Sequence, residues 1–226
     1  MKTALFTPLY LDGNDLLGNS RVLRNIRYVE YYESLKKRGY LNFDQLVMCD
    51  NGSHESNLKK FMDGIEPYHQ GNVSVHCFSD HIARGAGYSY GYAWRALHFM
   101  RRLIGTGFDK IVTIDSDGFI LSERLATYVN ESDVGWEAFW CPKYGFPEAA
   151  FHILNRDVFD FFIGFTSTPW QRLNGLIMEK TLPFTKVNKH FVTDRFGETE
   201  TTQKPEWDYC GQTPLSMKLE FVCGTT

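Results

Sequence analysis

The residues best suited to do chemistry in this sequence are two aspartates that flank one serine, Asp115-Ser116-Asp117. The apolar, β-branched run 110–114 precedes them and Gly118 follows, which predicts a buried strand that ends at the two carboxylates. Side chains alternate along a strand, so the two aspartates can face the same side. Two hard oxygen ligands suit Mn²⁺ or Mg²⁺, which keep positions open for water and phosphate oxygens. The motif therefore predicts metal-assisted chemistry on a diphosphate.

Three other structures can contain an Asp-x-Asp-Gly sequence. An ordinary turn uses Asp and Gly for their backbone conformations alone. A calcium loop of the EF-hand type is excluded, because Ile120 and Ala126 stand where that loop requires Gly and Glu. A phosphohydrolase of the haloacid dehalogenase type would use Asp115 as a nucleophile toward phosphate. That class remains the alternative, although Phe119 replaces its usual Thr or Val and no later Asp-Asp pair completes a metal site.

Composition limits the classes of protein to consider. With 226 residues, of which 43% are hydrophobic, the chain can form one domain with a full core. Its net charge of −3 argues against a nucleic-acid partner. Five scattered cysteines without a Cys-x-x-Cys pair indicate neither a disulfide framework nor structural zinc. No apolar run approaches the length of a membrane helix and no signal peptide is evident, so we expect a cytoplasmic protein.

Strands and helices are predicted to alternate in the first half of the chain. The elements expected are strands at 3–9, 44–49, 72–78 and 110–114, and helices at 21–38, 55–62 and 89–103. Alternation of this kind predicts a parallel sheet, in which ligands bind at the carboxyl ends of the strands. The second half is expected to contain helices at 123–129 and 156–162, strands at 136–140 and 149–154, and short proline-punctuated segments after 166.

With these elements in place, the chain resembles the GT-A class of nucleotide-sugar-dependent glycosyltransferases. The resemblance rests on the α/β first half, the strand that ends at Asp115-Ser116-Asp117, and the segment Phe146–Asp157. That segment is similar to the strand and helix that hold the donor sugar in retaining members, but Pro147-Glu148-Ala149 replaces their usual small polar triplet. Residues 3–162 carry the resemblance, which extends to small soluble transferases of large DNA viruses.

The resemblance implies an α/β fold of the GT-A, Rossmann-like type, with a mainly parallel central sheet flanked by helices. One domain would span residues 1–226, with a nucleotide-binding half at 1–118 and a donor-sugar and acceptor half at 119–226. Seven residues would then bind the nucleotide: Thr7, Leu9, Tyr10, Asp50, Arg84, Asp115 and Ser116. For the first five, a solvated strand-end position is the alternative.

Metal ligands and catalytic residues follow from the same resemblance. Asp117 would bind the metal directly, and Asp115 directly, through water or through a ribose hydroxyl. A third ligand is commonly a C-terminal histidine, for which His190 has the best position in the chain. For the acceptor side, Asp208 is similar to an acidic residue that opens a late helix, although a helix N-cap would also explain it. Glu206 and Glu148 are the alternative catalytic residues.

The sequence therefore predicts a glycosyltransferase that uses Mn²⁺ or Mg²⁺ and a UDP-linked sugar, with a glycan or glycoprotein as the acceptor. Retention is favoured slightly over inversion because of the segment from Glu148 to Asn155. Besides the phosphohydrolase, a carbohydrate-binding module without catalysis is a third class, in which the aspartates form only a turn. Nucleotide binding that requires Mn²⁺ would separate the transferase from both.

Overall fold

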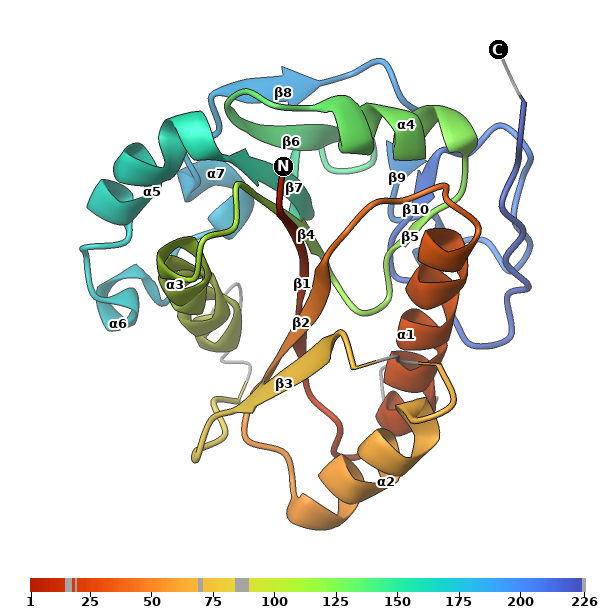
Figure 1. The fold of residues 1–226 in the computed structure, drawn as a ribbon, viewed down its shortest axis with the longest axis horizontal. Coiled ribbons are helices and arrows are strands. Elements are labelled where there is room, and N and C mark those ends of the chain that lie inside the picture. The colour runs from red at the N-terminus through yellow and green to blue at the C-terminus, as the bar shows by residue number, and fades with distance from the viewer. Residues whose placement is uncertain (15–17, 19, 69–70, 84–89, 225–226) are drawn as a thin grey trace.

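A seven-stranded sheet lies between two layers of helices in the computed structural model, which describes residues 1–14, 18, 20–68, 71–83 and 90–224 (Figure 1). The strand order is β3-β2-β1-β4-β7-β6-β8. Every neighbouring pair is parallel except those that β7 makes with β4 and β6. The prediction of a mainly parallel central sheet is therefore confirmed.

The first half of the chain forms the parallel part of the sheet and its crossover helices. Its elements are β1 (Thr3–Leu9), α1 (Arg21–Lys37), β2 (Gln45–Asp50), α2 (Glu55–Ile65), β3 (Val73–Cys77), α3 (Gly91–Gly105) and β4 (Lys110–Ile114). Helix α1 begins after Ser20, whose side chain accepts a hydrogen bond from the Leu23 amide. It stops before Gly39, which has a φ of +76°, a backbone conformation that favours glycine at a helix end.

The second half adds the antiparallel strand and a smaller three-stranded sheet, β5-β10-β9. Its elements are β5 (Phe119–Ile120), α4 (Glu123–Glu131), β6 (Trp136–Cys141), β7 (Phe146–Asn155), a 3₁₀ turn (Arg156–Val158), α5 (Phe159–Phe165), α6 (Trp170–Leu173), α7 (Met178–Thr181), β8 (Lys186–Asn188), β9 (Thr193–Asp194), a second 3₁₀ turn (Phe196–Glu198) and β10 (Tyr209–Cys210). Most of the short segments after residue 166 have no periodicity that predicts them.

Two predictions about local structure are wrong. The expected loop before residue 149 is in fact the start of β7, which pairs with β6 around a β-bulge between Ala138 and Trp140. The late helix expected to open at Asp208 is also absent, because Tyr209 pairs with Ile120 on one side and Thr193 on the other. The first error concerns pairing within a hairpin, and only the second concerns pairing with strands far away in the sequence.

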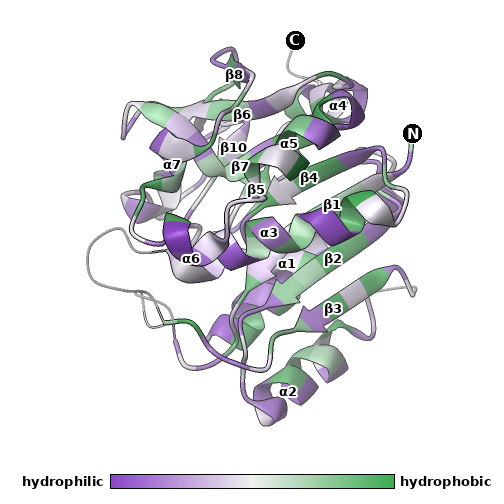
Figure 2. Ribbon diagram, turned by 90° about the vertical axis from the view of Figure 1, so that its left-hand side faces the viewer, coloured by the Kyte–Doolittle hydropathy of each residue, from purple (hydrophilic) through white to green (hydrophobic). Residues whose placement is uncertain are grey.

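Each face of the central sheet carries its own hydrophobic cluster. Helices α1, α2 and α4 cover one face, where Tyr28, Tyr32 and Phe119 are fully buried. Helices α3 and α5 cover the other with Trp94 and Phe162. Apolar residues run along β1 and β2 between these layers (Figure 2). Burial of one large apolar side chain contributes roughly 1.5–3 kcal/mol, so the two clusters hold the strand ends in place. None of the helices described is long and apolar enough to cross a membrane.

Candidate functional site

The Asp115-Ser116-Asp117 motif forms a turn at the carboxyl end of β4, held by backbone hydrogen bonds. The Asp115 amide donates to the Ala150 carbonyl on β7 at 2.9 Å, and the Gly118 amide donates back to the Asp115 carbonyl at 2.8 Å. The Thr213 amide donates to the Asp117 carbonyl at 2.9 Å. The turn is thus fixed by its own strand, by β7 and by the segment after β10. We refer to residues 115–118 as the acidic turn.

Two cavities meet at the acidic turn. The strand-end cavity, of about 440 Å³, lies beyond β1 and β2 and is lined by Leu9, Tyr10, Arg21, Arg24, Asn51, His81 and the acidic turn up to Asp117. The α3 cavity, of about 420 Å³, lies between α3, β4, β7 and α7. Four residues line both cavities: Pro8, Tyr92, Asp115 and Gln212. Asp115 therefore lies where a ligand would pass from one cavity into the other.

The strand-end cavity combines stacked rings with basic side chains. The Tyr10 and His81 rings are stacked, with centroids 4.1 Å apart and an interplanar angle of 19°. The guanidinium of Arg21 lies over the Tyr10 ring at 5.1 Å. Arg24 lies on the same face of α1, and its Nη1 is 3.4 Å from Asp117 Oδ2. A planar base and negatively charged phosphates both suit such a cavity.

The α3 cavity is lined by both apolar and charged side chains. Helix α3 contributes the apolar residues Ala96, Leu97 and Met100. The polar and charged lining residues include Tyr144, Glu179, Lys180, Arg195 and Glu198. Thr113 and His152, which are paired across β4 and β7, provide polar groups on the sheet side. A sugar or another amphiphilic group could therefore place its polar edge toward Asp115 and Arg195.

His152 is a neutral, structural histidine at the wall of the α3 cavity, as its alternation with apolar residues suggests. The indole Nε1 of Trp136 donates to His152 Nδ1 at 3.1 Å, which places the ring proton on Nε2. Burial lowers the pKa of His152 to about 3. Among the residues described, none accepts a hydrogen bond from its Nε2, so this N–H is available to a ligand in the cavity.

The depressed pKa of His152 predicts that the fold loses stability in acid. The unfolded histidine, with a pKa near 6.5, binds a proton as the pH falls, whereas the folded one does not until about pH 3. The free energy of unfolding should therefore fall by about 2 kcal/mol between pH 7 and pH 5 because of this group alone. Urea denaturation at both pH values measures the change, and His152→Gln should remove it, while the exposed His54→Gln should not.

The electrostatics of the acidic turn favour a bound cation. Burial, and then the neighbouring carboxylates of Asp117 and Glu148, raise the pKa of Asp115 well above its usual value. None of the described residues donates a hydrogen bond to the Asp115 carboxylate. Among the described residues, no group of three or more His, Cys, Asp or Glu side chains forms a metal site. Two carboxylates nevertheless fit Mg²⁺ or Mn²⁺, whose other ligands are often water and substrate phosphate.

The structure brings four of the seven expected nucleotide-binding residues to the strand-end cavity: Leu9, Tyr10, Asp115 and Ser116. Thr7 is fully buried below it, and its hydroxyl donates to the Pro8 carbonyl at 3.3 Å. Asp50 is also fully buried and accepts hydrogen bonds from the Ser53 amide and hydroxyl, so its neighbour Asn51 lines the cavity instead. Arg84 lies outside the described residues.

The structure does not bring His190 to the aspartates. His190 follows β8, the edge strand, which is three strand positions and about 14 Å from β4. Its side chain is exposed, its amide donates to Asn188 Oδ1 at 2.9 Å, and it lines neither cavity. His190 was predicted only from its position in the sequence. The first residue after it that lines the α3 cavity is Arg195.

Two of the three expected catalytic carboxylates are also remote from the cavities. Asp208 is buried and accepts hydrogen bonds from the Ser122 hydroxyl at 2.5 Å, the Val192 amide at 2.7 Å and the Arg124 guanidinium. Glu206 is exposed in the turn before it. These contacts make Asp208 a link between α4 and the smaller sheet. Because β10 follows it, Asp208 is not the helix N-cap that the alternative proposed.

Glu148 is the expected catalytic residue that does lie beside the site. It is buried on β7, and both of its oxygens accept from Arg195, from Nη2 and Nε, at 2.7 Å each. Arg195 Nη2 also contacts Glu179 Oε1 at 3.0 Å. Glu148 itself lines neither cavity, but Arg195, which holds its carboxylate, lines the α3 cavity, and the charge of Glu148 acts on Asp115.

Several residues at the site were missed in the sequence, and three of them show why. Arg195 follows a two-residue strand without any motif, so nothing in its surroundings indicated it. Arg24 could have been found, because it lies three residues after Arg21 and so on the same face of α1. Gln212 lines both cavities with a φ of 56°, the only positive value at a residue other than glycine in the described ranges. Such backbone strain often occurs at functional sites.

No protein-family profile and no curated protein matches the sequence. Among solved structures, the apo structure of the bifunctional glycosyltransferase WbbM is similar over 94% of this chain, with a TM-score of 0.55 and 13% identity, and this chain spans 46% of its length. A mannosyltransferase from Pyrobaculum calidifontis, in complex with GDP-Man and Mn²⁺, gives a TM-score of 0.45 and 12% identity, covering 71% of this chain and 46% of that one. A glycosyltransferase involved in glycosylation of the PBCV-1 major capsid gives 0.44 and 9%, covering 87% and 84%. The likeness to the first of these confirms the expected α/β fold of GT-A type.

Proposed function

We propose that this chain is a metal-dependent glycosyltransferase that moves a sugar from a nucleoside diphosphate, UDP in the first instance, to a hydroxyl of a glycan or glycoprotein. The observation that carries this proposal is the position of Asp115 and Asp117 at the carboxyl end of β4, where the two cavities meet. A fold of the GT-A type supports it. In a parallel sheet this edge is where ligands bind.

The two cavities suggest how a sugar nucleotide would lie. The base and ribose would occupy the strand-end cavity beside Tyr10 and His81, and the diphosphate would lie at the acidic turn. The sugar, attached to the second phosphate, would then enter the α3 cavity past Asp115. Arg24 supports this arrangement because it places a positive charge beside Asp117 at the cavity wall.

The residues of the site favour departure of the diphosphate. A Mn²⁺ or Mg²⁺ ion bound by Asp115 and Asp117 would neutralise the charge that develops on the leaving phosphate. Arg24 orients the Asp117 carboxylate, while Arg195 holds both oxygens of Glu148 beside the cavity. These contacts hold the acidic groups in one arrangement before the substrate binds.

We further propose that the sugar is transferred with retention. An inverting reaction needs a carboxylate free to accept the proton of the attacking hydroxyl. The Glu148 carboxylate accepts hydrogen bonds from Arg195. The Asp208 carboxylate accepts from Arg124 and lies away from both cavities. Because each of these expected bases is paired with an arginine, neither is free to accept that proton. This supports transfer with retention.

The proposal is tested by the thermal stability of the protein with UDP, GDP or inorganic phosphate, each with and without Mn²⁺. A ligand that binds the native state stabilises it by roughly 2.7 kcal/mol at a hundred times its dissociation constant. We expect one nucleoside diphosphate to raise the melting temperature only when Mn²⁺ is present. In Asp117→Ala we expect no such rise. Equal stabilisation by phosphate alone, with a phosphorylated Asp115, would instead support the dehalogenase-type phosphohydrolase. Sugar binding indifferent to nucleotide and metal would indicate a carbohydrate-binding module.

A further inference from the structure

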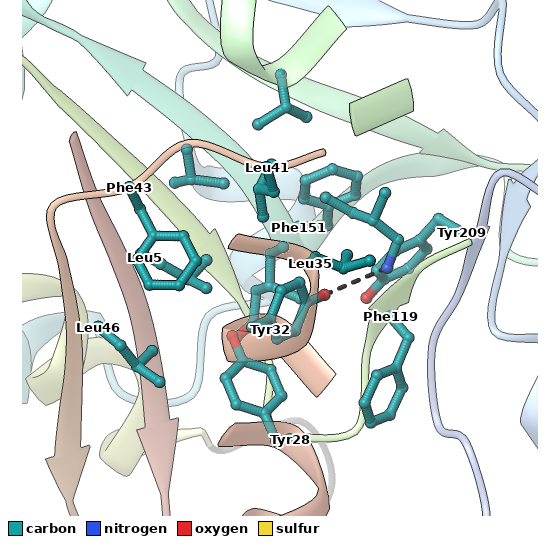
Figure 3. Packing of buried hydrophobic residues seen from close by; sticks show 14 of the residues in the cluster. Leu5, Tyr28, Tyr32, Leu35, Leu41, Phe43, Leu46, Phe119, Phe151 and Tyr209 are labelled. Carbon is teal, nitrogen blue, oxygen red and sulfur yellow. Dashed lines mark hydrogen bonds between the residues drawn. The ribbon is translucent and has the colours of Figure 1, made fainter. Parts of the chain in front are cut away.

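The hydroxyl of Tyr209 is a buried polar group that has no hydrogen-bond partner among the described residues. Tyr209 belongs to β10, its side chain is almost fully buried, and its ring stacks on Phe151 with centroids 4.8 Å apart. Figure 3 shows it beside Phe119 in the cluster on the α1 face. No described residue forms a hydrogen bond with its hydroxyl oxygen. An unpaired buried hydroxyl is unfavourable, so its presence needs an explanation.

The other buried tyrosines around it are all hydrogen-bonded. Tyr28 donates to the Ile114 carbonyl at 3.0 Å and Tyr31 to the Ile120 carbonyl at 2.5 Å. Tyr32 donates to the Gly118 carbonyl at 3.0 Å and accepts from the Ile120 amide at 3.2 Å, the latter drawn as a dashed line in Figure 3. The lack of a hydrogen-bond partner is therefore specific to Tyr209 and is not shared by Tyr28, Tyr31 or Tyr32.

The Tyr209 hydroxyl lies directly against the acidic turn. A β-carbon on Gly118 would be 2.2 Å from the hydroxyl oxygen, so glycine is needed there to leave room for it. Burial and the nearby charges of Glu148, Asp115 and Asp117 raise the pKa of Tyr209, which keeps it protonated and able to donate. The unpaired hydroxyl thus lies close to three carboxyl groups, those of Asp115, Asp117 and Glu148.

Of these carboxylates, Asp115 is the one whose oxygens have no donor among the described residues. Glu148 is already held by Arg195, and Asp117 lies beside Arg24. An unpaired donor on β10 therefore lies against the turn that carries an unpaired acceptor. Carboxylates that bind metals are usually held in place by such a second hydrogen bond, because it fixes the orientation of the ligating oxygen.

We propose that Tyr209 is a positioning residue for the acidic turn, and that its hydroxyl donates a hydrogen bond to the Asp115 carboxylate when a divalent cation binds there. This inference rests on the proposed function, since it assumes that the turn binds a cation. A hydrogen bond from this hydroxyl to a metal-bound carboxylate would be charge-assisted, and such bonds are stronger than those between neutral groups. The unpaired hydroxyl destabilises the free protein, but it places the donor in position before the cation binds.

The test is Tyr209→Phe, with Mn²⁺ alone as the probe. We expect the melting temperature without metal to be unchanged or higher, because an unpaired buried hydroxyl is removed. The dissociation constant for Mn²⁺, measured by titration with electron paramagnetic resonance, should rise 10- to 100-fold, the effect typical of losing a residue that orients a metal ligand. A purely structural tyrosine would give the opposite pattern, with a lower melting temperature and unchanged Mn²⁺ binding.

Tyr31→Phe is the matched control, because it removes a hydroxyl that is hydrogen-bonded to Ile120 in the same cluster. This variant should melt at a lower temperature and bind Mn²⁺ as the wild type does. Wild-type Mn²⁺ binding in Tyr209→Phe would overturn the inference and leave the proposed function intact. Failure of the wild type itself to bind Mn²⁺, with or without UDP, would instead overturn the proposed metal site and the positioning role together.

Discussion

Asp115→Asn is expected to lower the proposed sugar transfer by about 10²–10³-fold without loss of stability. The substitution keeps the size of the side chain but removes a carboxylate that repels its neighbours Asp117 and Glu148 in the free protein. The free energy of unfolding should therefore stay the same or increase. Cleavage of the sugar nucleotide should fall about 10²–10³-fold, which is the effect of removing one preorganised group that stabilises developing charge.

The measurement is release of nucleoside diphosphate from the donor identified by thermal stability, together with urea denaturation of the same samples. Asp109→Asn is the control, because Asp109 lies just before the other end of β4 and pairs with Arg156 at 2.7 Å on the surface. That variant should keep its activity. Activity in Asp115→Asn at the wild-type level would exclude Asp115 from the reaction.

Arg195→Met is expected to destabilise the fold by about 3–5 kcal/mol. Arg195 is itself largely buried and neutralises two carboxylates, Glu148 and Glu179, whose side chains are only 5% and 11% exposed. Without the guanidinium, both negative charges remain in a poorly solvated site next to Asp115, and one must take up a proton or the turn must move. Because the Glu148 carboxylate would no longer be held, nucleotide and metal binding should weaken as well.

Urea denaturation measures this loss, and Arg156→Met provides the comparison. Arg156 also forms an ion pair, with Asp109, but its side chain is 78% exposed. Exposed pairs contribute roughly 0–1 kcal/mol, so this second variant should unfold almost as the wild type does. Equal effects of the two substitutions would show that Glu148 and Glu179 do not depend on Arg195 for their charge.

The sequence predicted the first half of the fold well because its elements have strong local patterns. Strand Thr3–Leu9 and strand Lys110–Ile114 were predicted with the bounds that the structure has, and helix α1 differs by one residue. Each combines an apolar or periodic run with a clear stop, such as Gly39 after α1. The position of the two aspartates at a strand end followed directly from this.

The remaining site residues depend on contacts between segments far apart in the sequence, which no local pattern contains. Asp208 resembled a residue at the start of a helix, yet strand pairing of Tyr209 with Ile120, 89 residues before it, turns the segment into a strand. His190 was chosen by its order in the chain, but the sheet places it at the far edge. Arg195 acquires its role only because Glu148 and Glu179 converge on it.

The antiparallel orientation of β7 has a consequence for how this protein could diversify. Because β7 runs against β4, its beginning lies beside Asp115, and the short connection 142–145 from β6 borders the α3 cavity through Tyr144. Hairpin connections at a surface tolerate insertions better than the strands they join. Evolution, or a laboratory library, could therefore lengthen this connection and reshape the sugar side of the site, while the acidic turn at the end of β4 keeps its place.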